Sequence, residues 1–296
     1  MRLKPTNMPL LTTKRKIALA RLLQRPVLLC RHLLGFRSQA EVRRSGFRWR
    51  LDLGEGIDFT IYALGAFERT SQAACRRFIE PGAVVLDIGA NVGAHVLPLA
   101  RQVGPRGRVF AFEPTVWALK KLRANLDLNP QLKDRVTVEQ ILCVEKADDA
   151  LPAAAMASWP LVPGEDVHPL ARGRFLSTEG ARAMTLDDYL ASQNLHGVDF
   201  VKLDVDGDEC AVLRGAFRLL KELRPVVLME LAPHVLEERG ETIGSLLAVL
   251  GSVGYALAEE RSGRPLPMQE KELYQWVPHG ASRNVLALPE ECIATL

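Results

Sequence analysis

Several patterns that mark common protein classes are missing from this chain. It has no run of about eighteen apolar residues, so no helix is expected to cross a membrane. Its five cysteines include no C-x-x-C pair, so we expect reduced thiols and a cytoplasmic protein. Its six histidines form no H-E-x-x-H motif and no cluster with cysteines, so no metal site is predicted. The G-x-G-x-x-G pattern of dinucleotide-binding proteins is also absent.

Acidic residues are scarce at one end of the chain. Residues 1–50 contain 13 Lys or Arg and one acid, Glu41, whereas the other 246 residues carry 25 bases and 34 acids. Between residues 14 and 31 the bases alternate with aliphatic residues, and Pro26 is expected to kink or split any helix formed there. No uncharged apolar core precedes a small-residue cleavage site, so a secretory signal is not expected.

The charge distribution predicts two parts, a basic and partly helical extension at residues 1–45 and a domain at residues 46–296. Two interpretations of the extension stay open. It packs against the domain as a solvated leader, or residues 1–35 contact a membrane surface or a polyanion. Nucleic acid is not among the partners that we expect.

The most informative segment is residues 84–96. A short apolar run ends at Asp87, a glycine-bearing turn follows, and an apolar segment at helical spacing comes next, which is typical of the start of a βαβ unit. Gly89 and Gly93 would let a ligand lie against bare backbone. The G-x-x-x-G spacing after an acid favours a cofactor with a positive charge and no phosphate, such as S-adenosylmethionine, over NAD.

A second apolar run, residues 108–112, ends at Glu113. An acid at the tip of a second strand can accept hydrogen bonds from both hydroxyls of a ribose. The alternative is a surface Glu near the start of the helix that Pro114 opens. In combination with the first motif, we predict ribose binding.

The rest of the chain alternates strands and helices, which predicts a mostly parallel sheet covered on both faces. A hairpin of residues 47–51 and 58–62 is expected before it, with Gly54 and Gly56 in the turn. Residues 146–181 break the pattern and predict an irregular insertion that acts as a lid or a substrate loop. The expected strands are residues 83–88, 108–112, 136–138, 198–204, 226–230, 254–258 and 284–288, and the expected helices include 69–79, 92–103, 115–128 and 209–222.

Four acids end apolar runs, and the carboxyl ends of parallel strands share one edge of a sheet, where ligands bind. These acids are Asp87, Glu113, Asp204 and Glu230. An edge rich in carboxylates repels phosphate and favours a sulfonium and an ammonium group, both present in S-adenosylmethionine.

Lys202 lies two residues before Asp204, so both side chains point to the same face of their strand. We interpret them as a polar pair at the substrate end of the site, with Asp204 as a candidate general base. A structural ion pair is the alternative. His95 and His168 are candidates for substrate contact, although a packing role for His95 fits the sequence equally well.

Taken together, these segments resemble FkbM-type methyltransferases. The resemblance covers roughly residues 46–290 and rests on five motifs and a Gly-aromatic-Glu element, residues 65–68, ahead of the first strand. The motifs are residues 87–93, 112–114, 185–188, 201–207 and 224–230.

The resemblance implies a Rossmann-like class I methyltransferase fold, with seven strands of which the last is antiparallel. It also implies transfer of a methyl group to a hydroxyl of a small molecule or glycan. The chain departs from the family at Asp206, where a Glu is usual, and at Glu145, where Asp is common. We expect Asp206 and Glu230 near the substrate. The residues expected to hold the cofactor are Asp87, Gly89, Ala90, Asn91, Gly93, Glu113, Pro114 and Glu145.

The leading hypothesis is therefore O-methyl transfer from S-adenosylmethionine to a small molecule, a glycan or a lipid-linked sugar. N-methylation stays open, although the N-P-P-Y element of many amino-group methyltransferases is absent. A nicotinamide-dependent oxidoreductase and a non-catalytic module that keeps the fold are the alternatives from other classes.

Overall fold

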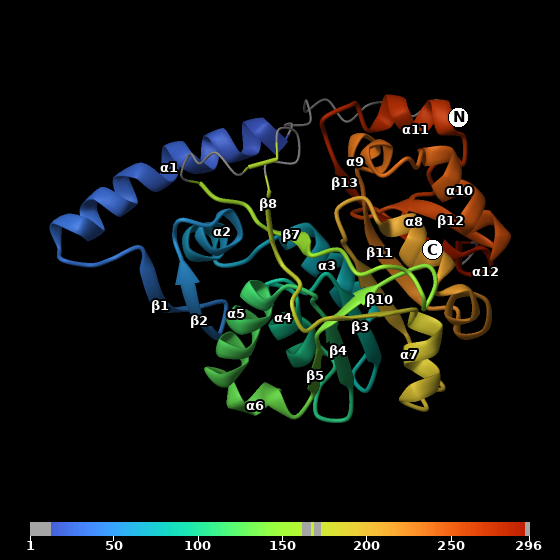
Figure 1. The fold of residues 1–296 in the computed structure, drawn as a ribbon, viewed down its shortest axis with the longest axis horizontal. Helices are drawn as coiled ribbons and strands as arrows, with labels where there is room; N and C mark the ends of the chain where they lie inside the picture. The colour runs from blue at the N-terminus through green and yellow to red at the C-terminus, as the bar shows by residue number, and fades with distance from the viewer. Residues whose placement is uncertain (1–12, 162–166, 169–172, 294–296) are drawn as a thin grey trace.

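The computed structural model describes residues 13–161, 167–168 and 173–293, and a seven-stranded sheet forms its centre (Figure 1). The strand order is β12-β13-β11-β10-β3-β4-β5, and β13 runs antiparallel to both of its neighbours while the other pairs are parallel. This confirms the predicted Rossmann-like sheet. Its strands are β3 (Val84–Ile88), β4 (Arg108–Phe112), β5 (Val136–Glu139), β10 (Phe200–Leu203), β11 (Val226–Leu231), β12 (Tyr255–Glu259) and β13 (Arg283–Pro289).

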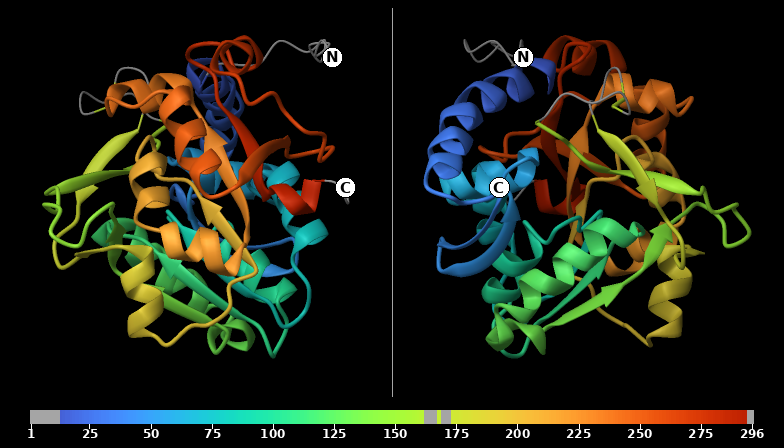
Figure 2. Two further views of the ribbon diagram at one scale, coloured as in Figure 1. Left: turned by 90° about the vertical axis from the view of Figure 1, so that its right-hand side faces the viewer. Right: turned by 60° about the vertical axis from the view of Figure 1, so that its left-hand side comes forward.

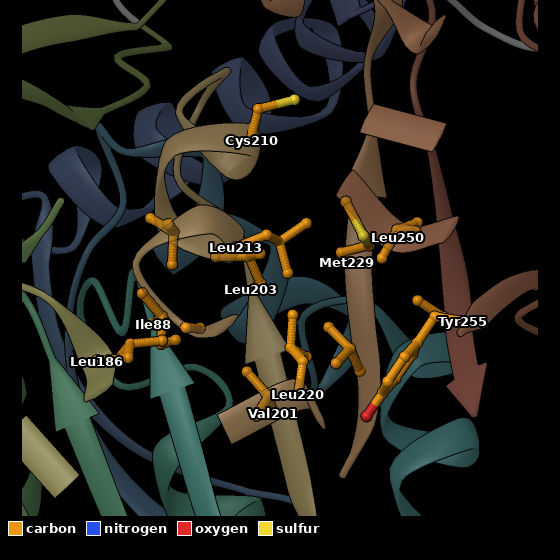
Figure 3. Close-up of a cluster of buried hydrophobic side chains, with 14 of the residues drawn as sticks. Ile88, Leu186, Val201, Leu203, Cys210, Leu213, Leu220, Met229, Leu250 and Tyr255 are labelled. Carbon is orange, nitrogen blue, oxygen red and sulfur yellow. The ribbon is translucent and has the colours of Figure 1, made fainter. Parts of the chain in front are cut away.

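Helices cover both faces of the sheet, because alternate residues of each strand point to opposite sides. Leu86 and Ile88 enter an apolar cluster that includes residues of α7, α8 and α10, part of which Figure 3 shows. Val85 enters a second cluster with residues of α3, α4 and α5. The helices around the sheet are α3 (Arg69–Phe78), α4 (Val96–Gln102), α5 (Val116–Asp127), α6 (Pro130–Lys133), α7 (Leu186–Ser192), α8 (Glu209–Arg214), a π-helix (Leu219–Leu223), α9 (Pro233–Glu238), α10 (Ile243–Ser252), α11 (Glu270–Trp276) and α12 (Glu290–Ile293).

The predicted hairpin is in the wrong place. β1 (Gln39–Arg44) pairs with β2 (Phe47–Asp52), whereas residues 58–62 lie in α2 (Gly56–Leu64). The turn is Ser45-Gly46, with φ of 51° and 86°, which is the backbone that a two-residue hairpin needs. The expected boundary at residue 45 thus falls inside the hairpin.

Within the predicted N-terminal extension, one helix, α1 (Thr13–Leu33), precedes β1 and contacts α2 (Figures 1 and 2). The expected split at Pro26 does not occur. Proline removes one backbone hydrogen bond, to the carbonyl of Leu22, but both residues lie on the exposed side where water can solvate that carbonyl. Residues 1–12, part of the predicted membrane contact, are outside the described residues.

The insertion is less irregular than predicted. β7 (Ala154–Ser158) and β8 (Arg174–Ser177) form an antiparallel pair, and β6 (Ile141–Cys143) pairs with β9 (Arg182–Met184) in parallel. The backbone N–H and C=O groups of each short strand need hydrogen-bond partners, and a strand that is distant in sequence supplies them. Residues 162–166 and 169–172 of the insertion lie outside the described residues.

Two further expectations concern the whole chain. All five cysteines are free thiols. Among the described residues, none of the helices combines the length and the apolar content that crossing a lipid bilayer requires.

Candidate active site

A cavity of about 580 Å³ lies at the carboxyl edge of the sheet, within the size range of small-molecule sites. Its sheet side is formed by the residues that follow β3, β4 and β10 and by Glu230 in β11. Helices α1 and α2 and strands β6 and β7 supply the other walls. The predicted edge of strand-tip acids therefore borders a real cavity.

The polar residues Asp87, Lys202 and Glu230, at the tips of β3, β10 and β11, point to the same face of the sheet. Lys202 alternates with Val201 and Leu203, which belong to the apolar cluster on the other face. Asp87 lies beside Lys202 in the register of β3 and β10. Period-two alternation thus leaves one face of each strand apolar to its end and gives the other face a polar tip.

The two motif glycines, Gly89 and Gly93, have different structural roles. Gly89 lines the cavity, and its φ is 80°; a Cβ there would lie 1.8 Å from the carbonyl oxygen of Asp204. Only glycine lets the loop pass so close to the end of β10. Gly93 is not among the residues that line the cavity; a Cβ there would lie 2.6 Å from Leu122 Cδ1, so this glycine lets α5 pack closely.

Glu113 fastens the loop to the next strand. Its Oε2 accepts a hydrogen bond from the backbone N–H of Asn91 at 2.9 Å, and its Oε1 accepts from the N–H and hydroxyl of Thr115 at 2.9 and 2.5 Å. A carboxylate offers about four acceptor positions, so one is left for a ribose hydroxyl. Burial raises the pKa of Glu113, and the hydrogen bonds from Thr115 and Asn91 oppose that rise.

Asn91 connects the loop to the insertion. Its side-chain amide donates to the carbonyl of Ala157 in β7 at 2.9 Å, and its φ of 47° is in the left-handed region that Asn tolerates. Ala90 and Pro114 lie on the cavity wall, as do Asn91 and Glu113.

Asp87 is fully buried and is not among the residues that line the cavity. Neither of its carboxylate oxygens has a hydrogen-bond partner within the described part of the chain. Burial raises its pKa, and the nearby charges of Lys202 and His95 lower it. The arrangement supports an electrostatic role beneath the loop in place of the direct cofactor contact that we expected.

Lys202 and Asp204 form the predicted pair. Lys202 Nζ lies 2.8 Å from Asp204 Oδ2, and both residues line the cavity. Burial lowers the pKa of Lys202, but Asp204, Asp87 and Glu68 outweigh burial and raise it, so the lysine stays charged. Asp204 keeps 31% of its side chain exposed, so it can contact a ligand.

Two further acids share this end of the cavity. The pKa of Asp206 lies well above its usual value because of burial and the nearby Asp204, and its φ is 52°. Burial, followed by the charge of Asp204, raises the pKa of Glu230 to about 8. Glu230 is therefore mostly protonated at neutral pH and can donate a hydrogen bond.

A partly buried pair that the sequence did not predict lies beside them. Glu68 Oε2 is 3.2 Å from His95 Nε2, and both residues line the cavity. Burial raises the pKa of Glu68, yet the hydrogen bond and charge of His95, together with Lys202, bring it down to about 2. Only the Gly-aromatic-Glu element at residues 65–68 could have indicated Glu68, and nothing local connected it to His95.

Two predicted residues lie elsewhere. Glu145 forms an ion pair with Arg214 at 3.2 Å, and His168 lies 3.5 Å from Glu238; neither is among the residues that line the cavity. His234, which lines the cavity at the start of α9, was not predicted; burial and the neighbouring His279 lower its pKa. Across the described residues there is no group of three His, Cys, Asp or Glu arranged to hold a metal ion.

The residues around the loop fit S-adenosylmethionine. Glu113 has an acceptor to spare, the loop exposes backbone at Gly89 and Ala90, and the apolar residues Ile141 and Cys143 form a wall suited to adenine.

Comparison with known proteins agrees with this geometry. The family model described as "Methyltransferase FkbM domain" matches residues 87–257. The chain is similar to "Methyltransferase 1" of Beauveria bassiana (strain ARSEF 2860), with 27% identity over 195 residues that cover 60% of this chain and 74% of that protein. A segment of 48 residues is 50% identical to part of the AMB antimetabolite synthetase AmbE of Pseudomonas aeruginosa, covering 16% of this chain and 2% of that protein.

Two of the solved structures to which the chain is similar are the following. A protein described as a putative rRNA-methylase from Clostridium thermocellum gives a TM-score of 0.44 at 15% identity, covering 74% of this chain and 92% of that one. A methyltransferase FkbM from Methylobacillus flagellatus KT gives 0.40 at 15% identity, covering 77% and 57%. Because the family model spans more than half of the sequence and the loop, acids and cavity fit the cofactor, the chain belongs to the FkbM family of S-adenosylmethionine-dependent methyltransferases.

Proposed function

We propose that this methyltransferase acts on a hydroxyl group, carried by a small molecule, a glycan or a lipid-linked sugar. The observation that carries the proposal is the pair of Lys202 and Asp204, 2.8 Å apart, on the wall of the cavity that the glycine loop also lines. A hydroxyl must lose its proton on methylation, so a hydroxyl acceptor needs a base within reach.

S-adenosylmethionine, which the loop after β3 and Glu113 would hold, would supply a methyl group activated by a positively charged sulfur. Asp204 would accept the proton that the acceptor hydroxyl loses on methylation. Lys202, 2.8 Å away, fixes the orientation of the Asp204 carboxylate. Protonated Glu230 can donate a hydrogen bond to another oxygen of the acceptor. Alignment of the reacting atoms supplies much of the acceleration, because the leaving group is already activated.

The test is Asp204→Asn. We expect unchanged affinity for S-adenosylmethionine by titration calorimetry and a fall in turnover of at least about 100-fold, the usual contribution of a general base. Turnover is followed with a labelled methyl donor and cell extracts, and mass spectrometry identifies a product that gains one CH₂ on oxygen.

Asp199→Asn is the matched control, because Asp199 lies at the opposite end of the same strand and accepts a hydrogen bond from the N–H of Val84. Equal losses of affinity and turnover in Asp204→Asn would contradict the role of a base. A product methylated on nitrogen would overturn the acceptor class, and no product at all with intact donor binding would favour a non-catalytic module.

A further inference from the structure

Helix α1 has two apolar faces, and only one of them packs against the rest of the described residues. Ile17, Ala20, Val27 and Leu28 are partly buried against the cluster that includes α2 and β2. On the opposite side, a stripe of apolar residues with helical spacing is exposed to solvent. The outer stripe consists of Leu19, Leu22, Pro26, Leu29 and Leu33.

This outer stripe is unusual for the molecule. Its four leucines are between 49% and 75% exposed, and Leu34 and Phe36 after the helix are 73% and 58% exposed. Single exposed leucines need no explanation, but a continuous apolar stripe on one helix usually marks a binding surface.

The charges beside the stripe indicate what binds there. Lys14, Lys16 and Arg25 are exposed, and α1 contains no acidic residue. An apolar stripe with basic flanks is the pattern of a helix that lies in the surface of a bilayer with anionic lipids. The heptad-like spacing of the stripe would also suit a second copy of α1, but pairing two copies would bring like charges together.

The position of α1 connects this surface to the cavity. Lys16, Leu19 and Leu23 line the cavity, and Leu19 and Leu23 are also about half exposed. Leu64, at the end of α2, lines the cavity and is 63% exposed. Figure 1 shows α1 along the edge of the molecule, with α2 between it and the sheet.

We propose that the outer stripe of α1 docks on an anionic membrane surface and thereby brings the mouth of the cavity to the lipid. Within the proposed function, on which this part rests, the hydroxyl acceptor is then one that is held in the bilayer by an apolar chain. The polar group of such an acceptor would reach the acids at the sheet edge while its chain leaves between α1 and α2.

The test is co-sedimentation of the full chain with vesicles of phosphatidylcholine alone and of phosphatidylcholine mixed equally with phosphatidylglycerol. We expect the anionic vesicles to bind at least about tenfold more tightly, and added salt to weaken that binding. The double variant Leu22→Glu with Leu29→Glu should lose binding by more than about tenfold. The double variant Lys14→Glu with Arg25→Glu should weaken binding to the anionic vesicles by about fivefold for each positive charge removed.

Phe217→Glu is the matched control, because Phe217 is 43% exposed between α8 and the π-helix, far along the chain from α1. It should bind vesicles as the unchanged protein does. Unfolding in urea shows that each variant is folded. Titration of S-adenosylmethionine without vesicles separates the two proposals, since donor binding without vesicle binding overturns only the docking.

Three results would overturn the docking proposal. The first is equal binding to both vesicle types or binding to neither. The second is full binding by the Leu22→Glu, Leu29→Glu variant. The third is a dimer in sedimentation equilibrium that the leucine variant dissolves while vesicles are not bound, which would assign the stripe to a second copy of the chain.

Discussion

The two faces of the central sheet are made from the same strands, yet they do different work. In β10, Val201 and Leu203 enter an apolar cluster, while Lys202 and the following Asp204 reach the cavity. In β11, Met229 is buried in the same apolar cluster and Glu230 lines the cavity. Neighbouring residues thus differ in role because successive side chains of a strand point to opposite faces.

Adjacent residues of one strand therefore contribute either to the stability of the sheet or to the chemistry of the cavity. The face that packs on α7, α8 and α10, here called the apolar face, is apolar to the carboxyl ends of the strands. Its packing holds the strands in register and so fixes where the polar residues at the tips of the other face, here called the polar face, lie. The polar face carries groups with raised pKa values and an unpaired buried carboxylate, which costs stability. Substitutions on the two faces should therefore give different signatures.

The largest effect is expected on the apolar face. Leu203→Ala removes a fully buried side chain (Figure 3) and should lower the free energy of unfolding by about 2–5 kcal/mol. Urea unfolding followed by circular dichroism measures it. Leu203→Met, which roughly conserves volume, should cost less than about 1.5 kcal/mol. Equal losses in the two variants would contradict the packing role.

Substitutions on the polar face should change the affinity for S-adenosylmethionine. Glu113→Ala leaves the N–H groups of Asn91 and Thr115 without their acceptor and removes the carboxylate that we predict to bind the ribose, so affinity for S-adenosylmethionine should fall by about 1–3 kcal/mol. Calorimetry measures it. Glu139→Ala is the control, because Glu139 ends the adjacent strand β5 but is not among the residues that line the cavity. The same loss of affinity in both variants would refute the assignment of Glu113.

Glu230 gives a pH-dependent effect. Its pKa rises from 4.5 to about 8 on folding, so the folded state holds its proton more tightly than the unfolded state. Its contribution to stability is full below pH 4.5 and is lost as the pH rises through about 8. Glu230→Gln cannot ionise, so its stability relative to the unchanged protein should increase with pH across this range, by up to about 1.4 kcal/mol per pH unit. Urea unfolding at several pH values measures this, and parallel pH profiles would argue against a buried Glu230.

The smallest effect is expected at Glu145, away from the cavity. Its ion pair with Arg214 is partly exposed and Arg214 also pairs with Glu241, so Glu145→Ala should change stability by less than about 1 kcal/mol. Affinity for S-adenosylmethionine should stay within about twofold. A tenfold loss in calorimetry would restore the cofactor contact that we expected for Glu145.

The sequence predicted the sheet and its polar edge well, because both follow from local patterns. Apolar runs of strand length that end in an acid located Asp87, Glu113, Asp204 and Glu230, and a spacing of two placed Lys202 with Asp204. Thr185, a residue type favoured at helix starts, caps α7 by accepting a hydrogen bond from the N–H of Asp188. In contrast, the alternating pattern at residues 58–62 wrongly predicted a strand. The hairpin forms earlier in the chain, around the Ser45-Gly46 turn.

By itself, then, the order of residues determined which strands form, which acids end them and which family the chain resembles, since these depend on periodicity and short spacings. Only the tertiary structure decided that Gly93 serves packing, that Asp87 is sealed from the cavity, that Glu68 meets His95 and that α1 closes one side of the site. Each of these depends on groups far apart in the chain, whose meeting is fixed by the packing of layers and leaves no local mark in the sequence.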